Sequence, residues 1–168
     1  MRRRHLRSVL RIEAQVYARP WSLALFMSEL GLRATRSYVV ARVGGTVVGY
    51  AGLMLSGDDA HVTTIAVDPE WHRHRIGTRL LLFLARESLR REARNLTLEV
   101  RVSNHGAQAL YLQFGFKPAG IRKNYYQETN EDALVMWAED IDTADYRERL
   151  LELEAQVPGT TYIEDGRQ

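Results

Sequence analysis

Apolar residues recur at helical spacing at the start of the chain and follow strand-like patterns further along. Their spacing over 4–17 predicts an amphipathic helix. Ser22 then stands as the N-cap of a second helix over 23–30, and Gly31 as its C-cap. The first part of the chain is therefore predicted to be helical.

β-rich runs over 37–42 and 46–55 follow, separated by Gly44 and Gly45, which is the pattern of a hairpin. Further predicted elements are a strand over 61–67, a helix over 77–93, a strand over 95–102, a helix over 105–114 closed by Gly115, and strands over 118–126 and 133–138. This order predicts an α/β domain with a mixed sheet, flanking helices and crossover connections. After Asp140 the chain becomes charged and helical in pattern. We expect one domain over 1–140 and a helical extension with a surface tail over 141–168.

Composition narrows the classes of function. The chain has 168 residues, 45% of them hydrophobic, which suffices for one core. It has no cysteine, so disulfides, thiol nucleophiles and thiolate metal sites are excluded. A net charge of +2 does not indicate nucleic-acid binding, and we interpret the arginines at 2–4 as a solvated helix end. With no apolar stretch of membrane-spanning length and no export signal, we expect a cytoplasmic location.

A strand end, a short basic loop and a helix start follow one another over 65–78. The first N–H groups of a helix lack partners within it and lie at its positive end, which suits a bound pyrophosphate. Arg73 and Arg75 add positive charge. An ordinary basic strand-to-helix turn has the same pattern, so this stretch alone leaves both interpretations open. It is not the common P-loop, because the Gly-Lys-Ser/Thr ending is missing.

Glu99 lies in the middle of an apolar strand, where an ionised carboxylate is costly to bury. Desolvation would raise its pKa toward the value that a general base needs. The alternatives are a partner for Arg101 or another cation, or a solvent-facing strand edge. Tyr111 lies at helical spacing among alanines, a pattern that by itself indicates a core residue.

Three segments together resemble the GNAT superfamily of acetyl-CoA-dependent N-acetyltransferases, over most of 4–139. They read TIAVDP, then LEVRVSN with ALYLQFGF, then IRKNYYQETNEDALVM. The last two, in that order, are more specific and are similar to the RimI-type ribosomal-protein alanine N-acetyltransferases. The resemblance implies a splayed central sheet, acetyl-CoA as co-substrate, and a protein N-terminus, from a ribosomal protein with N-terminal alanine, as acceptor.

The resemblance also implies roles for individual residues. Glu99 corresponds to the general base and Tyr111 to the general acid that protonates the departing thiolate. The residues implied in cofactor binding are Ile65, Ala66 and Val67 for the pantetheine arm, Arg73, His74, Arg75, Ile76, Gly77 and Thr78 for the pyrophosphate, and Asn104 for the arm again. Asn124, Tyr125 and Glu131 correspond to the acceptor groove, and a polar loop between edge strands is the alternative interpretation of these three residues.

The chemistry of the acceptor agrees with this interpretation. An α-amine titrates near ~7.7–8.0 and a lysine near ~10.4, so the α-amine is easier to deprotonate by about 3.5 kcal/mol. The reaction needs no metal, and His72 and His74 lack a third nearby ligand in the sequence. Two other functions stay open: acetylation of a lysine or small amine, and binding of acetyl-CoA without turnover.

The chain departs from the GNAT pattern at two places. Arg75 stands where the phosphate loop usually has a glycine, and a left-handed backbone there would cost roughly 1–2 kcal/mol. Its side chain either crowds the pyrophosphate or pairs with it, and we expect weakened but intact cofactor binding. Relatives also have a strand before the first helix, whereas here the helical pattern begins almost at Met1. We therefore expect either a late start or a sheet without one edge strand.

Overall fold

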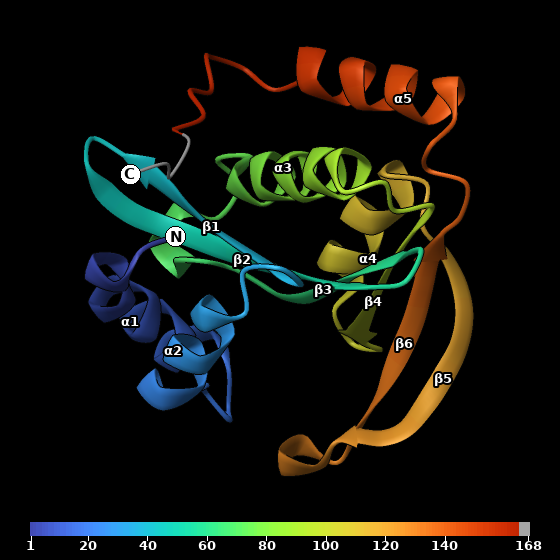
Figure 1. The fold of residues 1–168 in the computed structure, drawn as a ribbon. Helices are drawn as coiled ribbons and strands as arrows, with labels where there is room; N and C mark the ends of the chain where they lie inside the picture. The colour runs from blue at the N-terminus through green and yellow to red at the C-terminus, as the bar shows by residue number, and fades with distance from the viewer. Residues whose placement is uncertain (165–168) are drawn as a thin grey trace.

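The computed structural model describes residues 1–164 and shows a mixed sheet with helices on both faces (Figure 1). The helices are α1 (Leu6–Val16), α2 (Leu23–Gly31), α3 (Ile76–Arg90), α4 (His105–Gln113) and α5 (Ala144–Ala155). The strands are β1 (Arg36–Val43), β2 (Thr46–Ser56), β3 (Asp59–Val67), β4 (Asn95–Arg101), β5 (Lys117–Tyr126) and β6 (Glu131–Ala138). Short 3₁₀ helices η1 (Arg3–His5), η2 (Pro69–Trp71) and η3 (Gln127–Thr129) connect some of them. The predicted α/β class is confirmed.

The sheet has the strand order β1-β2-β3-β4-β6-β5, and the central pair β3–β4 is its parallel pair. That pairing covers only three residue pairs, from Asp59 with Asn95 to His61 with Thr97. Beyond His61 the two strands separate, and β4 continues in full antiparallel register with β6 (Figure 1). The predicted splayed sheet is therefore present, and the splay begins after His61.

Two separate cores lie on the two faces of the sheet. On one face α3 packs with α4 and α5 over β2, β3 and β4, with Leu81, Leu84 and Phe114 completely buried. On the other face α1 and α2 cover β2 and β3 through a smaller cluster that includes Ile12 and Phe26. β2 is buried on both sides because it lies between these two cores.

The caps show which local predictions succeed. Ser22 caps α2 by accepting a hydrogen bond from the Leu25 amide at 3.2 Å, and Gly115 ends α4 with a φ of 81°. The prediction that Gly31 is a C-cap is wrong, because Gly31 is the last residue of α2 and Leu32 is its C-cap. The helix predicted over 77–93 ends earlier, since Glu92 already has a φ of 61°.

The two ends of the chain pack against the sheet and α3. Within residues 1–164 no strand precedes α1, and the Met1 amine donates a hydrogen bond to the Tyr38 carbonyl of β1. At the other end α5 buries Tyr146, Leu150 and Leu153 in the core that α3 belongs to. The extension after Asp140 is thus packed onto the domain through its helix, while 158–164 are exposed and 165–168 lie outside the described residues.

A β-bulge interrupts the pairing of β2 with β3 just after the splay begins. Gly52 pairs with Thr64 and Leu53 with Val62, so Thr63 has no partner on β2. Gly52 is needed there because a Cβ would lie 2.2 Å from Cε1 of Tyr38 and 2.6 Å from Oγ1 of Thr63. The bulge keeps Val62 and Ile65 against the same core although they are three residues apart.

Gly52→Ala is expected to destabilise the protein by about 1–3 kcal/mol, because the Tyr38 ring must move to admit a methyl group. The free energy of unfolding in urea measures this change. Gly120→Ala is the matched control within a strand, since nothing lies within 4 Å of the Cβ position there. An equal effect of the two substitutions would contradict the proposed steric cause.

Candidate active site

The separation of β3 from β4 leaves one edge of β3 without a neighbouring strand over 64–67, which we call the open edge. The Asp68 amide donates to the Val48 carbonyl of β2 at 2.9 Å, so Asp68 faces β2. Backbone groups alternate in direction along a strand, and those of Ile65 and Val67 therefore face the open edge. Such unpaired groups can pair with an extended ligand as a further strand would.

Side chains already bond the carbonyl groups on this edge. The Tyr17 hydroxyl, from the end of α1, donates to the Ile65 carbonyl at 2.9 Å. Nε2 of His72 lies 3.2 Å from the Val67 carbonyl oxygen. Burial raises the pKa of the Tyr17 hydroxyl, so it stays protonated and remains a donor. The open edge is thus held in shape from both of its ends.

The loop between β3 and α3 has the geometry of an anion site. Within residues 1–164, no backbone N–H group from Arg73 to Thr78 has a hydrogen-bond acceptor. These groups lie at the N-terminus of the long helix α3, where the helix dipole favours negative charge. Arg73, His74 and Arg75 are exposed beside them, while Ile76 and Thr78 are buried and fix the start of the helix. This local structure is compatible with the pyrophosphate site, which stays a prediction.

Arg75 adopts the left-handed conformation that its position in the pattern suggested, with a φ of 58° and a ψ of 17°. Arg73 is also left-handed, with a φ of 64°. A non-glycine residue in this region costs roughly 1–2 kcal/mol. The loop therefore carries conformational strain at two arginines that also supply its positive charge.

Glu99 projects from β4 toward the face of the sheet that α1 and α2 cover, and its two oxygens have different partners. Oε2 lies 3.0 Å from Nε2 of His61 on β3, and Oε1 lies 3.2 Å from Nη2 of Arg122 on β5. The hydrogen bond to His61 and the charges of His61 and Arg122 lower the pKa of the Glu99 carboxyl, although burial acts in the opposite direction. The expected rise of this pKa is therefore wrong, and Arg101 is not the partner of Glu99.

Tyr111 lies in α4 and belongs to the core that also contains α3, with only 6% of its surface exposed. Its ring packs 5.8 Å from that of Phe116, as expected for a core residue. Burial first, and then the nearby Tyr17 and Tyr126, raise the pKa of its hydroxyl well above the usual value. The hydroxyl therefore stays protonated at neutral pH and has no acceptor among residues 1–164. A buried ring with an unpaired hydroxyl is compatible with both a core role and a donor role.

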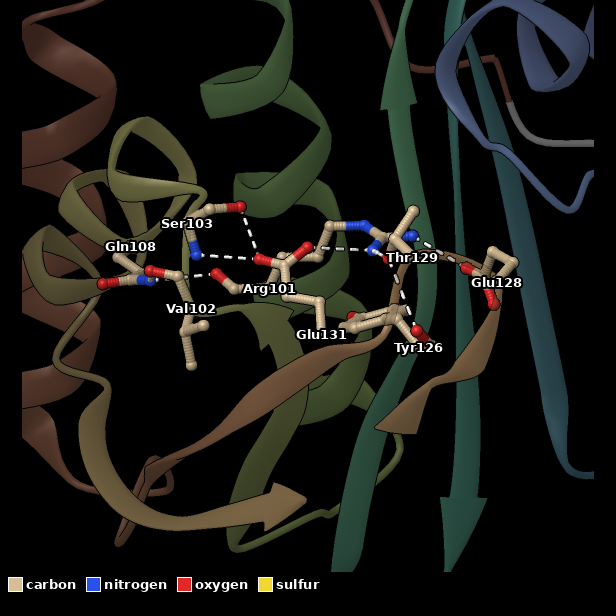
Figure 2. Close-up of polar contacts among 8 residues, drawn as sticks. All are labelled: Arg101, Val102, Ser103, Gln108, Tyr126, Glu128, Thr129 and Glu131. Atoms are coloured by element: carbon tan, nitrogen blue, oxygen red, sulfur yellow. Dashed lines mark hydrogen bonds and ion pairs between the residues drawn. The ribbon is translucent and has the colours of Figure 1, made fainter. Parts of the chain in front are cut away.

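Arg101 joins the end of β4 to the β5–β6 hairpin (Figure 2). Its guanidinium contacts Glu128 at 2.8 Å and Glu131 at 3.0 Å and lies 3.9 Å from the centre of the Tyr126 ring. The Ser103 amide donates to Glu131 at 3.0 Å, so the same carboxylate also reaches the start of α4. This network holds the tip of the hairpin beside the opening in the sheet.

The predicted acceptor residues lie on or near this hairpin but differ in availability. Both carboxylate oxygens of Glu131 are engaged by Arg101 and Ser103, which gives this residue a structural function. Asn124 has a φ of 49° in an irregularity of β5, and its backbone N–H donates to Oδ1 of Asp132 at 2.8 Å. Tyr125 is 46% exposed and packs edge-on against Tyr126. Of the three, Tyr125 is the most available to an acceptor.

Asn104 stands at the N-terminus of α4 and acts as its cap, with its Oδ1 accepting from the Ala107 amide at 3.1 Å. This role was not predicted, and it uses the side-chain oxygen. The predicted contact of Asn104 with the cofactor stays a prediction.

Sequence reasoning missed four residues that shape the site, namely Tyr17, His61, Arg101 and Arg122. Arg101 was considered only as a partner of Glu99, and the other three reach the site through contacts between distant elements. A weak signal existed for His61. An ionisable side chain in its largely apolar strand is as unusual as Glu99 is in the strand that carries it.

Glu13 is a buried carboxylate on α1 close to Tyr17. Only 1% of its surface is exposed, and its Oε1 accepts from the Trp21 amide at 2.8 Å. Oε2 has no hydrogen-bond partner in the described part of the chain. Burial raises the pKa of this carboxyl to about 7. Glu13 therefore fixes the connection between α1 and α2. Because its pKa is raised, its carboxyl keeps its proton up to near neutral pH.

The described residues contain no group of three or more side chains that could hold a metal ion. Their helices are also too short or too polar to cross a membrane.

Comparisons with known proteins agree with the geometry. The model of the acetyltransferase (GNAT) family matches residues 6–116. A putative ribosomal protein bS18-alanine N-acetyltransferase of Bacillus subtilis is 42% identical over 137 residues, covering 82% of this chain and 91% of that protein. The ribosomal protein bS18-alanine N-acetyltransferase of Escherichia coli K12 is 39% identical over 127 residues, covering 74% and 84%. The crystal structure of the ribosomal-protein-S18-alanine N-acetyltransferase from Escherichia coli superimposes with a TM-score of 0.76 at 35% identity, covering 83% and 90%.

Arg75→Gly is expected to stabilise the protein by about 0.5–1 kcal/mol, because relief of the left-handed strain exceeds the entropy that glycine adds to the unfolded chain. Chemical denaturation measures the difference. Arg33→Gly removes the same charge from an exposed turn position without a positive φ, and we expect it to destabilise by about 0.4–1 kcal/mol. A loss of stability in both variants would contradict the strain at Arg75.

Glu13 is expected to make the stability depend on pH. Its pKa is raised in the folded state, so between about pH 4.5 and pH 7 the folded protein holds a proton that the unfolded chain releases. The contribution of Glu13 to stability is therefore complete below this window and falls as the pH rises through it. Glu13→Gln should remove about 1–3 kcal/mol of that decline, measured as free energies of unfolding at pH 5 and pH 7.5. Identical pH dependence in both proteins would contradict the assignment.

Proposed function

The chain belongs to the acetyltransferase (GNAT) family, and we propose that it transfers the acetyl group of acetyl-CoA to the α-amine of a protein N-terminus. The observation that carries this proposal is the open edge of β3 followed, after η2, by the unpaired amides of 73–78. The two features suit an extended arm and a pyrophosphate, which are two parts of one ligand.

Acetyl-CoA fits the residues present. The backbone amides of Ile65 and Val67 would pair with its pantetheine arm along the open edge, whereas the backbone groups of Ala66, also predicted for this role, face β2. Asn104 would hold the same arm from the start of α4. The pyrophosphate would be bound by the amides of Arg73, His74, Arg75, Ile76, Gly77 and Thr78. When bound, acetyl-CoA supplies the thioester that the amine attacks.

Glu99 and Tyr111 would then carry out the two proton transfers of the reaction. The ionised Glu99 carboxylate accepts a proton from the attacking nitrogen, and the protonated Tyr111 hydroxyl donates one to the departing thiolate. Because its partners hold Glu99 at a low pKa, it is a weak base. It therefore suits an amine that is already partly neutral, and this favours an α-amine over lysine by about 3.5 kcal/mol.

The proposed acceptor is a ribosomal protein with an N-terminal alanine. The support is that relatives 39–42% identical over most of their length are named ribosomal protein bS18-alanine N-acetyltransferases. Tyr125 on the β5–β6 hairpin, together with Asn124, would contact the start of the acceptor chain. Glu131 would act indirectly, by holding the hairpin in position, since its oxygens are engaged by Arg101 and Ser103.

Release of CoA from acetyl-CoA tests this proposal with two peptides. One has a free N-terminal alanine, and the other has a blocked α-amine and a lysine. We expect turnover of the first peptide only, and a loss of kcat by about 10²–10⁴ in Glu99→Gln and in Tyr111→Phe.

Glu152→Gln and Tyr162→Phe are matched controls, because both side chains are exposed and lie outside the site. Turnover of the lysine peptide instead would replace the proposed acceptor. Binding of acetyl-CoA without turnover of either peptide would favour a non-catalytic acetyl-CoA-binding domain.

A further inference from the structure

The start of α1 carries a concentration of positive charge that the net charge of the chain conceals. Every charged side chain of 1–11 is an arginine, whereas the segment 139–154 around α5 is predominantly acidic. A net charge of +2 therefore does not describe the potential at this end of the molecule. We call four of these arginines the basic cluster: Arg2, which is half-buried, and Arg3, Arg4 and Arg7, which are exposed.

Two acidic residues near this end of the molecule pair with other arginines. Asp68 lies 2.8 Å from Arg11, one helical turn beyond Arg7. Glu164 lies 2.5 Å from Arg42, at the end of β1. Within residues 1–164, no member of the basic cluster forms an ion pair. The cluster therefore keeps its positive charge unneutralised in this part of the chain.

His5 lies among these arginines and experiences their combined charge. Burial lowers the pKa of His5, and the charges of the N-terminal amine, Arg4, Arg42 and Arg2 lower it further. Arg42 belongs to β1, so the edge of the sheet adds to the positive potential at the start of the helix. The charge thus comes from two elements that the fold brings together.

The basic cluster is unfavourable for the free protein in two ways. Arg3 and Arg7 are four residues apart, and Arg4 and Arg7 are three apart, where η1 runs directly into α1. Like charges at these spacings repel each other on a helix. The arginines also lie at the positive end of the helix dipole, and the first turn of α1 contains no acidic residue. A bound anion would relieve both unfavourable interactions.

We propose that the basic cluster is an interaction surface for the phosphate backbone of RNA. Guanidinium groups form forked, charge-assisted hydrogen bonds with phosphate oxygens. The cluster has no aromatic ring that could stack on a base, so its binding would depend little on sequence. We choose RNA among the polyanions because the proposed acceptor is a ribosomal protein, and in this choice the inference rests on the proposed function. The arginines at 2–4 would then be a binding surface and not a solvated helix end.

The packing of α1 argues against a membrane as the partner of the basic cluster. A basic amphipathic helix binds a lipid surface by burying its apolar face among the lipids. In α1 that face consists of Leu6, Val9 and Ile12, and it is buried against the sheet and α2. The start of the helix therefore presents arginines to its surroundings without the apolar face that insertion requires.

The basic cluster and the open edge of β3 lie at opposite ends of α1 (Figure 1). Tyr17, which bonds the Ile65 carbonyl, follows the last residue of the helix. The helix between Tyr17 and η1 has 11 residues, which span about 16 Å at ~1.5 Å per residue. RNA on the cluster would therefore lie beside the proposed active site without covering the open edge.

Fluorescence anisotropy of a labelled RNA hairpin tests the proposal in wild type and in Arg3→Gln/Arg7→Gln. Neither arginine side chain has a hydrogen bond or ion pair within residues 1–164, so the substitutions remove charge without breaking a contact there. We expect the double variant to bind about tenfold more weakly at ~50 mM KCl. The slope of log K against log [KCl] should become shallower by about 1.4–1.8, as expected for the loss of two phosphate contacts.

Arg33→Gln/Arg147→Gln is the matched control, because both residues are exposed and the change in net charge is the same. It should bind the hairpin nearly as tightly as the wild type. An equal loss in this control, or no RNA binding by the wild type at ~50 mM KCl, would overturn the proposal. Tighter binding to phosphatidylserine vesicles than to RNA would overturn it in favour of a membrane, and tighter binding to polyglutamate in favour of an acidic protein.

The melting temperature provides a second test that needs no ligand. Because the arginines repel each other and oppose the helix dipole, Arg3→Gln/Arg7→Gln should have a higher Tm than the wild type at low salt. The difference should shrink at high salt, where exposed charges are screened. The control pair should show no such rise. The absence of a rise in the first variant would overturn the argument for a bound anion.

Turnover of the alanine peptide separates this inference from the proposed function. Both double variants should keep the wild-type kcat and KM, because a free peptide does not need the basic cluster. A raised KM in Arg3→Gln/Arg7→Gln alone would show that the cluster binds the acceptor peptide and would overturn the proposal. RNA binding by a protein that acetylates neither peptide would overturn the proposed function and leave the RNA surface in place.

Discussion

The short pairing between β3 and β4 is the constraint on which the rest of the structure depends. Three residue pairs join the two halves of the sheet, and the pairing stops at His61 and Thr97. If it continued, the backbone groups of Ile65 and Val67 would be bonded to β4 and unavailable to a ligand. Buried backbone groups without partners are costly, so an opening of this kind persists only if something else bonds them. Tyr17 and His72 do this for two carbonyl groups.

The opening is kept at a defined width by contacts on both of its sides. On the β4 side, Arg101 ties the hairpin tip to the strand end, and Glu131 extends the tie to α4. On the β3 side, the α1–α2 connection is fixed through Glu13 and Tyr17. These contacts are polar because apolar side chains would pack together and close the space that a ligand needs. The consequence is a site whose walls contain several partly buried charges.

The sequence predicted the elements well and the contacts between them poorly. Periodicity and turn residues placed all the strands and major helices, because these signals are local. The sequence could not show that Glu99 lies between His61 and Arg122. That arrangement depends on the register of β3 against β4 and on the curvature of the β5–β6 hairpin. The predicted rise in the pKa of Glu99 failed for this reason: burial was foreseen, but its two partners were not. Glu131 was likewise located correctly, while its engagement by Arg101 and Ser103 depends on the fold.

Arg75 shows how a local rule can conflict with a ligand site. A left-handed arginine costs roughly 1–2 kcal/mol in the folded protein, and glycine would avoid most of that cost. A charge-assisted hydrogen bond from the same side chain to a pyrophosphate would contribute about 1.5–3 kcal/mol in the complex. The strain would be present in both states, whereas the hydrogen bond would exist only in the complex. If the Arg75 side chain pairs with a bound pyrophosphate, arginine at this position lowers the stability of the free protein while it strengthens binding, and a glycine would reverse both effects. Stability and binding would then change in opposite directions at a single residue, because the unpaired amides of 73–78 would provide the rest of the proposed anion site.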